Sequence, residues 1–171
     1  QDKSGIEVEV EHYVNYVPNH SIYSQTYSPQ STAGTSVSLY DDSNVGPFNI
    51  GFNFEFYGQT FSQFRICTNG FITFGNTSGR YSPGSFPSGT APNGVVAAYW
   101  TDLYPSSGYY MRYQTTGTAP NRKLIVSAHL TYYSNRNAWV DYQIVLFEGT
   151  NKIWTTITTQ GWTPTATQGV E

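Results

Sequence analysis

The chain has 171 residues, of which 38% are apolar and only 11% are charged, and its net charge is −3. Soluble domains usually carry about 25% charged residues, so Ser, Thr, Asn, Gln, Gly and Tyr must supply most of this surface. The eight Lys and Arg residues are scattered, which excludes the clustered cations of a nucleic-acid interface. The sequence contains no run of 18 apolar residues, so no membrane-spanning helix is expected.

The length and the aromatic content predict a single all-β domain. Fifteen Tyr and ten Phe suit pleated, half-buried surfaces, whereas strong helix formers are sparse. The lone cysteine, Cys67, cannot form an internal disulfide. Because free cysteines are among the most buried residues, we expect Cys67 to be a small core residue.

The N-terminal residues predict an arm that precedes the main domain. Apolar and acidic residues alternate from Ile6 through Val8 to Val10, which is the period of a half-buried strand. Residues 21–38 are polar and predict an extended loop or a sheet edge. We therefore divide the chain into an N-terminal extension over residues 1–25 and a sandwich domain over residues 26–171.

The strongest structural signal lies at residues 48–56, where five apolar residues share one face of a strand: Phe48, Ile50, Phe52, Phe54 and Phe56. Gly58 permits a tight turn into a second strand at 61–67. Asn69-Gly70 is a strong hairpin signal that leads into a strand at 71–74.

The second half of the chain continues this pattern. A loop rich in Gly and Pro occupies residues 75–94, and strands are expected at 95–100, 109–114, 123–132, 139–147 and 153–159. Turn signals separate them by about ten residues, as in a sandwich or barrel. We predict an antiparallel, jelly-roll-like β-sandwich of about ten strands with little or no helix.

Several segments carry a resemblance to a known family. "FNIGFNFEFYGQTF" at residues 48–61, "ICTNGFITFG" at 66–75, "VVAAYWTDL" at 95–103 and "VDYQIVLFEGTNKIW" at 140–154 occur in the order of a β-sandwich module of bacterial secreted and surface proteins. The chain is also similar to the extracellular region of plexin-domain-containing proteins and, more distantly, to nidogen-like domains. The resemblance covers about residues 39–171. It implies an extracellular or cell-surface accessory or adhesion domain without a catalytic centre.

Two departures from that family suggest self-assembly. Similar modules usually continue with another strand after the final "GVE", and this chain carries about 25 additional residues at its start. An arm strand containing Ile6, Val8 and Val10 that pairs with the open edge of the next subunit would build a filament. The alternative is that this strand pairs within its own domain.

No arrangement of residues predicts catalysis. Glycoside hydrolysis needs two facing carboxylates, and Glu55 and Glu148 fit solvated surface positions better. His129 falls inside a strand, where a packed or hydrogen-bonded imidazole is expected. No metal-ligand spacing, nucleophile elbow or phosphate loop is present. We expect a non-enzymatic protein without a cofactor.

Two weaker hypotheses concern calcium and glycosylation. Oxygen ligands for calcium are offered by Asp41, Asp42 and Asn44, which Asp102 would join from another loop. The same residues are also ordinary in turns, where they bond their own backbone. Sequons at Asn19 and Asn76 suit surface loops of a secreted protein.

Carbohydrate binding is the best-supported molecular role. Adjacent strand residues face opposite sides, so each Tyr pair must present one ring away from the core. The candidate stacking residues are Tyr109, Tyr110, Tyr132, Tyr133, Trp139 and Trp162. Outward Tyr residues also stabilise cross-strand pairs without any ligand. Two hypotheses therefore remain: a module that binds a glycan or surface protein, and a structural subunit of an extracellular filament.

Overall fold

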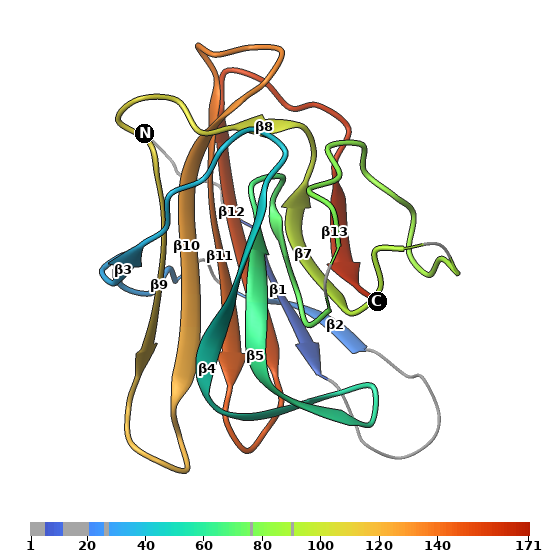
Figure 1. The fold of residues 1–171 in the computed structure, drawn as a ribbon, viewed down its shortest axis with the longest axis vertical. Helices are drawn as coiled ribbons and strands as arrows, with labels where there is room; N and C mark the ends of the chain where they lie inside the picture. The colour runs from blue at the N-terminus through green and yellow to red at the C-terminus, as the bar shows by residue number, and fades with distance from the viewer. Residues whose placement is uncertain (1–5, 12–20, 26–27, 76, 90) are drawn as a thin grey trace.

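The computed structural model describes residues 6–11, 21–25, 28–75, 77–89 and 91–171. These residues form two antiparallel sheets that pack face to face, as Figure 1 shows. They contain thirteen strands, ten of which have four residues or more, and no helix. The predicted all-β sandwich of about ten strands is confirmed. With no helix in this part of the chain, none is available there to cross a bilayer.

Sheet B contains five strands in the order β13-β7-β6-β5-β4. Their bounds are β4 Asn44–Phe56, β5 Gln59–Cys67, β6 Phe71–Thr73, β7 Val95–Trp100 and β13 Thr167–Val170. Four of them follow one another along the chain, so most of this sheet is a meander. β13 returns at the end of the chain to close one edge.

Sheet A contains eight strands, seven of them in the order β2-β1-β12-β11-β10-β9-β3, with β8 paired to β10. Their bounds are β1 Ile6–Glu11, β2 Ser21–Gln25, β3 Thr35–Ser36, β8 Leu103–Tyr104, β9 Tyr110–Thr116, β10 Lys123–Tyr132, β11 Trp139–Phe147 and β12 Ile153–Gln160. β9 to β12 form a second meander. The sandwich is therefore two stacked meanders, and its connectivity is not the paired Greek keys of a jelly roll.

The core lies between the two sheets and follows from the pattern at residues 48–56. Along β4, Ile50, Phe52, Phe54 and Phe56 are buried, and the residues between them are exposed. They pack against the inward residues of β10 and β11, among them Leu124, Val126, Leu130, Val140 and Ile144. A side-chain period of two places one whole set in the core, which confirms the predicted strand.

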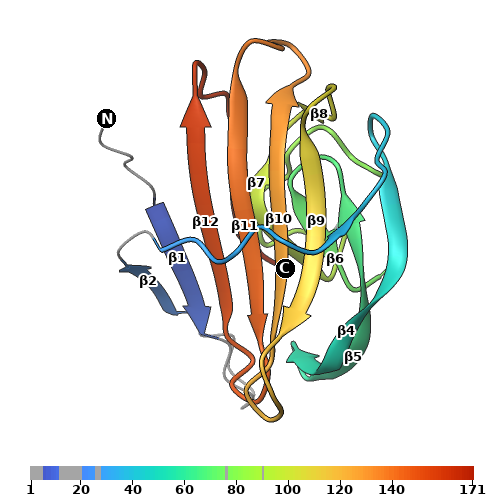
Figure 2. The ribbon, with the colours of Figure 1, turned by 90° about the vertical axis from the view of Figure 1, so that its left-hand side faces the viewer.

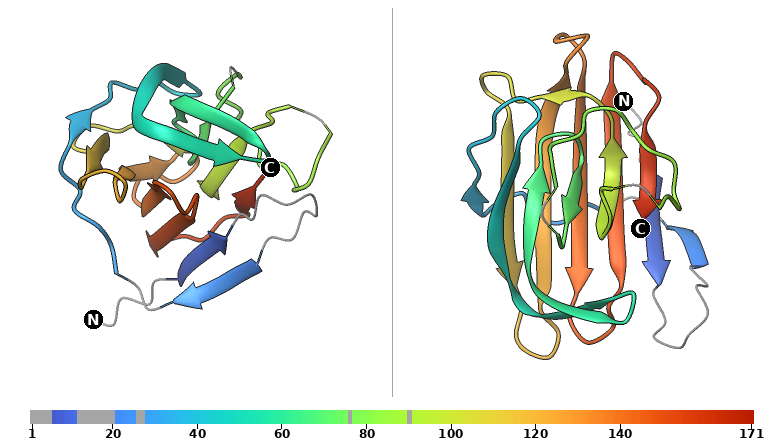
Figure 3. Two further views of the ribbon diagram at one scale, coloured as in Figure 1. Left: turned by 90° about the horizontal axis from the view of Figure 1, so that it is seen from below. Right: turned by 45° about the vertical axis from the view of Figure 1, so that its right-hand side comes forward.

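The outer face of sheet B is covered by the loop at residues 75–94. A second apolar cluster on that face contains Cys67, Phe71 and Trp100, with Phe86 of the loop packed against it. The indole of Trp100 donates to the carbonyl of Arg80 at 2.9 Å. Cys67 is fully buried, as predicted, and desolvation raises the pKa of its thiol to about 12. Figure 3 shows the loop lying over β7.

The outer face of sheet A is crossed by residues 28–34, a segment that we call the strap. In Figure 2 it passes in front of β12, β11, β10 and β9. The Gln143 side chain fixes it, because Gln30 N donates to Oε1 at 2.7 Å and Nε2 donates to Gln30 O at 2.8 Å. Gln114 Nε2 donates to Ser31 O at 3.1 Å. The strap thus behaves as an additional layer held by side-chain amides.

The N-terminal arm pairs within its own domain in this structure. β1 lies antiparallel to β12, with Ile6, Val8 and Val10 opposite Ile157, Thr155 and Ile153. β2 pairs with the other side of β1 and forms one edge of sheet A, while β3 forms the opposite edge. The polar segment at 21–38 therefore contributes both edges, in agreement with the predicted loop or edge.

The turn at Asn69-Gly70 joins β5 to β6 as predicted and ties several loops together. Asn69 is fully buried, and its side-chain amide donates to Asp42 Oδ1 at 2.7 Å and to Gly79 O at 3.0 Å. Its Oδ1 accepts from Leu103 N at 2.8 Å. Leu103 begins β8, so this one side chain connects the hairpin of sheet B to a strand of sheet A.

The packing around the Asn69-Gly70 turn can be tested by comparing Gly70 with Gly58, which lies in the open turn between β4 and β5. Both have positive φ, but a Cβ on Gly70 would lie 2.0 Å from the Tyr99 carbonyl oxygen, whereas a Cβ on Gly58 meets nothing within 4 Å. Gly58→Ala should cost about 1 kcal/mol of unfolding free energy, the cost of a left-handed alanine. Gly70→Ala should cost about 4 kcal/mol or prevent folding, because backbone must move. Urea unfolding measures both, and equal costs would contradict the packing argument.

Candidate carbohydrate-binding face

Three of the predicted stacking residues gather around the His129 imidazole of sheet A: Tyr110 and Trp139 lie on the outer face, and Tyr109 stacks on the imidazole while also packing against the core. The His129 ring lies 4.5 Å from the Tyr109 ring, 5.9 Å from the Tyr110 ring and 5.1 Å from the Trp139 ring, centroid to centroid. The first two contacts are stacked and the third is tilted. We call Tyr109, Tyr110, His129, Trp139 and Asp141 the outer-face cluster.

Strand register brings this cluster together. β9 and β11 flank β10, and His129 of β10 is paired with Tyr110 on one side and Asp141 on the other. Trp139 lies two residues from Asp141, on the same face of β11. Because directly opposed residues of antiparallel strands share a face, the pairing aligns an aromatic ring, an imidazole and a carboxylate in one row.

A hydrogen bond joins His129 to Asp141. Nδ1 of His129 lies 2.6 Å from Oδ1 of Asp141, and the two side chains are 28% and 40% exposed. An ionised carboxylate only accepts, so Nδ1 carries the hydrogen. Within the described part of the chain, Nε2 of His129 and Oδ2 of Asp141 have no hydrogen-bond partner. Both atoms are therefore available to a ligand.

A groove of about 410 Å³ runs beside this cluster, between the strap and the sheet. Its lining comprises Pro29, Gln30, Ser31, Thr32, Tyr110, Ser127, Ala128, Asp141, Tyr142, Gln143 and Thr156. The lining is rich in hydroxyl and amide groups, and Asp141 is its one carboxylate. The groove thus combines a ring, a carboxylate and many neutral polar groups, a combination found in small-molecule sites.

The other three predicted stacking residues lie elsewhere, and the prediction that Tyr132 is available for stacking is wrong. Tyr132 is fully buried in the core, since it faces inward on β10, and its neighbour Tyr133 is the outward member of that pair at 48% exposure. Trp162 is 38% exposed and packs edge-on against Tyr132, with ring centroids 5.0 Å apart. Neither Tyr133 nor Trp162 joins the outer-face cluster.

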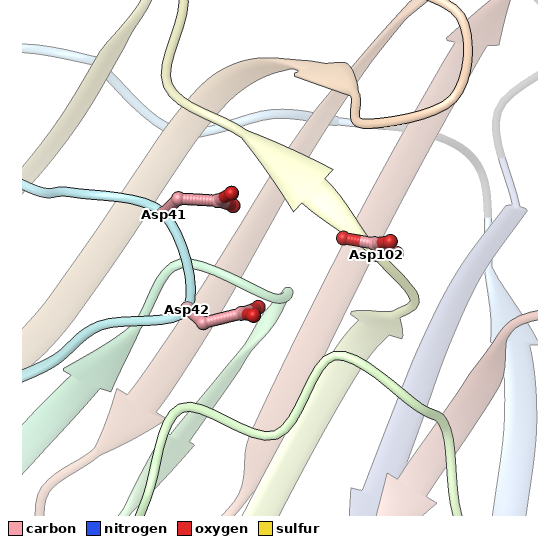
Figure 4. Close-up of side chains that lie close together, drawn as sticks. All are labelled: Asp41, Asp42 and Asp102. Carbon is pink, nitrogen blue, oxygen red and sulfur yellow. The ribbon is translucent and has the colours of Figure 1, made fainter.

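The carboxylates proposed for calcium do come together at one end of the sandwich. Asp41 and Asp42 lie in the turn before β4, and Asp102 lies between β7 and β8; their oxygens lie within 4.8 Å of one another. Figure 4 shows the carboxylates of Asp41 and Asp42 extending toward Asp102. We call these three residues the carboxylate cluster.

Asn44 does not belong to the carboxylate cluster, contrary to the calcium hypothesis as first framed. Its Oδ1 accepts from Arg65 Nε at 2.6 Å, and its carbonyl accepts from Arg65 Nη2 at 3.1 Å. Asn44 is the first residue of β4 and pairs with Cys67 of β5, so its side chain lies beside β5 and bonds Arg65 of that strand. The oxygen set for a cation is therefore three carboxylates.

Burial and mutual repulsion raise two pKa values in the carboxylate cluster. Burial, followed by the charge of Asp42, raises the pKa of Asp41, and burial followed by Asp42 and Asp41 raises the pKa of Asp102. The Arg136 guanidinium opposes both shifts. That guanidinium rests on the Tyr104 ring, 3.2 Å from its centroid, so its position is set by stacking. The cluster can hold a cation, and without one its charges repel.

A second cleft, of about 330 Å³, opens between β12 and β13. Its lining includes Tyr99, Ile157, Thr163 and Ala166, and none of its lining residues is charged. Glu148, considered above as a surface acid, forms an ion pair with Arg122. The described lining of this cleft contains one ring and no charged group, and Glu148 is already paired, so the outer-face cluster, with three rings and a carboxylate, remains the stronger candidate site.

Two contributors to the site, Asp141 and Gln143, were not singled out from the sequence. His129 was expected only to be packed or hydrogen-bonded, and it is both. The available signal was the two-residue period of a strand, which places the side chains of Trp139, Asp141 and Gln143 on one face of β11. The sequons at Asn19 and Asn76 lie outside the described residues.

The architecture places the protein among all-β sandwich domains that present a ligand-sized groove on one sheet. The chain belongs to the nidogen-related family, described as "NIDO related", which matches residues 16–171. This match extends beyond the residues 39–171 that carried the sequence resemblance, and it identifies an extracellular module. Neither the curated proteins nor the solved structures contain a significant match.

The carboxylate cluster makes a testable contribution to stability. A carboxyl whose pKa is raised by folding opposes folding at neutral pH, and the penalty disappears as pH falls below the unfolded pKa of about 4. Asp102→Asn should therefore raise the free energy of unfolding at pH 7 in EDTA by up to about 1 kcal/mol, with no gain near pH 3. Urea unfolding at the two pH values measures this difference, and a loss of stability at pH 7 would contradict it.

The same pair of proteins tests the calcium hypothesis. An ion that binds only the folded state raises the melting temperature. Calcium binding at the cluster predicts a higher melting temperature for the wild type in millimolar CaCl₂ and no change for Asp102→Asn. Equal responses of the two proteins would exclude the carboxylate cluster as the calcium site.

Proposed function

We propose that this chain is a non-catalytic adhesion or binding module of an extracellular protein, and that it binds carbohydrate at the outer face of sheet A. The observation that carries the proposal is the outer-face cluster beside the 410 Å³ groove. Family membership supports the extracellular setting. Sugar recognition is supported by the chemistry of the cluster itself.

Stacking and hydrogen bonding are both available at this face. Tyr110 and Trp139 are partly exposed, and a pyranose can lay its C–H face on such rings. Asp141 Oδ2 and His129 Nε2 lie in the same row, where Asp141 Oδ2 accepts from a hydroxyl and His129 Nε2 forms a hydrogen bond with a second one. Contacts between His129 and the three rings hold the cluster in place before a ligand arrives, which lowers the entropic cost of binding.

Two features support binding without catalysis. A glycosidase needs a second carboxylate across the groove, and Asp141 is the one acid among the described lining residues. A His-Asp pair in a hydrolase needs a nucleophile bonded to the imidazole. The two outward hydroxyls that flank His129 on β10 are both buried and have other partners: Ser127 Oγ accepts from Gln143 Nε2 at 3.1 Å, and Thr131 Oγ1 donates to Tyr104 O at 2.9 Å.

Removal of the partly exposed Trp139 indole tests the binding face. Trp139→Ala should weaken binding to a responsive oligosaccharide by about tenfold or more, because truncation of an aromatic anchor typically costs more than 1 kcal/mol. The oligosaccharide is chosen by screening cellohexaose, mannohexaose, chitohexaose and maltohexaose with the wild type. Isothermal titration calorimetry then measures the change in affinity.

The matched control is Tyr81→Ala, which removes another exposed ring from the loop over sheet B. This variant should bind with wild-type affinity, and both variants should retain a cooperative thermal transition. Equal losses of affinity in the two variants, or none in Trp139→Ala, would overturn the assignment of the binding face.

Assembly through the N-terminal arm is a second candidate function, favoured by one observation. β1 joins the sandwich by backbone pairing along the edge of β12, and that form of pairing can be supplied equally by an arm of another copy. Exchange of this kind produces dimers or open chains of subunits.

Deletion of residues 1–25 separates the two functions. Strand exchange predicts that the full chain forms large or fibrous particles and that the truncated chain is a monomer, as measured by light scattering and negative-stain imaging. The carbohydrate proposal predicts that truncation leaves the affinity for the oligosaccharide unchanged. A full chain that is already monomeric would exclude assembly by the arm.

A further inference from the structure

The charges and hydrogen-bonding roles of the outer-face cluster restrict what it can bind. Asp141 carries the one negative charge of the described groove lining, and no Lys or Arg lies among those lining residues. A carboxylate there repels an anionic ligand, because little screening occurs at contact distance in a partly enclosed groove. Uronic acid, sialic acid or sulfate groups are therefore poor occupants.

The free atoms of the cluster lead to the same restriction by a different route. Nδ1 of His129 donates to Asp141 Oδ1, which leaves the lone pairs of Asp141 Oδ2 facing the groove side of the cluster. An acceptor in this position favours a ligand group that donates. Sugar hydroxyls donate, whereas carboxylate and sulfate oxygens only accept.

One cation, Arg112, lies beside the groove without lining it. Arg112 follows Tyr110 by two residues on β9, and its guanidinium lies 4.5 Å from the centroid of the Tyr110 ring. Nη1 also points to Thr32 O of the strap at 3.5 Å. In this position Arg112 braces the aromatic ring and the strap, whereas Asp141 lies among the described lining residues themselves.

We infer that the site is selective for a neutral, hydroxyl-rich glycan, in which one hydroxyl donates to Asp141 Oδ2, another forms a hydrogen bond with His129 Nε2, and a sugar ring stacks on Trp139 or Tyr110. This inference rests on the proposed carbohydrate-binding function and names the chemical class of its ligand. Asp141 is the residue that decides between neutral and anionic sugars.

The experiment compares two ligand series on the intact protein. The neutral series is cellohexaose, mannohexaose and maltohexaose, and the anionic series is hexagalacturonate, sialyllactose and a heparin hexasaccharide. Titration calorimetry at 150 mM NaCl should detect binding within the neutral series and at least tenfold weaker binding throughout the anionic series. Asp141→Asn keeps an acceptor for His129 Nδ1 and replaces the Oδ2 acceptor with a donor amide. It should therefore weaken neutral-sugar binding by about tenfold or more.

Glu55→Gln is the matched control, because it removes one negative charge from an exposed position on sheet B. It should leave both series unchanged. Tighter binding of an anionic sugar that Arg112→Gln abolishes, or full affinity of Asp141→Asn for the neutral sugar, would overturn the selectivity while leaving carbohydrate binding intact. Failure of the wild type to bind either series would instead overturn the proposed function itself.

Discussion

The buried side chain of Asn69 is the interaction on which the end of the sandwich depends. Its amide and carbonyl groups satisfy Asp42, Gly79 and Leu103, which belong to three segments far apart in the sequence. Each such bond contributes about 1 kcal/mol net, but an unsatisfied buried partner costs more. The neighbouring Gly70 allows the turn to approach the backbone of Tyr99 and Trp100, where no side chain fits. Together they hold a sheet B hairpin against a sheet A strand.

The same interaction determines where the acidic groups lie. Thr68 donates to Tyr40 O at 2.8 Å, and its amide nitrogen donates to Ser43 O at 3.0 Å, so the turn that carries Asp41 and Asp42 is held from both ends. Asp102 immediately precedes the residue that Asn69 binds. The proximity of the three carboxylates therefore follows from a structural polar network, and their repulsion is the electrostatic cost of that arrangement.

The covering of the outer faces determines where a ligand can bind. The loop at 75–94 buries Trp100 and Phe71 on sheet B, and the strap buries Ser127 and Gln143 on sheet A. Beyond the strap, the row that contains His129 and Asp141 stays partly exposed. Asp141 is the one carboxylate among the described residues that line the groove beside this row.

The sequence by itself determined the elements whose signals are local. Alternation at 48–56 identified β4 and its buried face, and Asn69-Gly70 identified a hairpin, because each signal depends on residues close in the chain. Parity also required one ring of Tyr132-Tyr133 to face outward. Only the tertiary structure decided which ring that is, since the inward side of a strand is set by the sheet packed against it. The hydrogen bonds of Asn44 with Arg65 and of His129 with Asp141 were also decided by the tertiary structure. Strand register selects partners that lie many residues away, and no local pattern encodes that register.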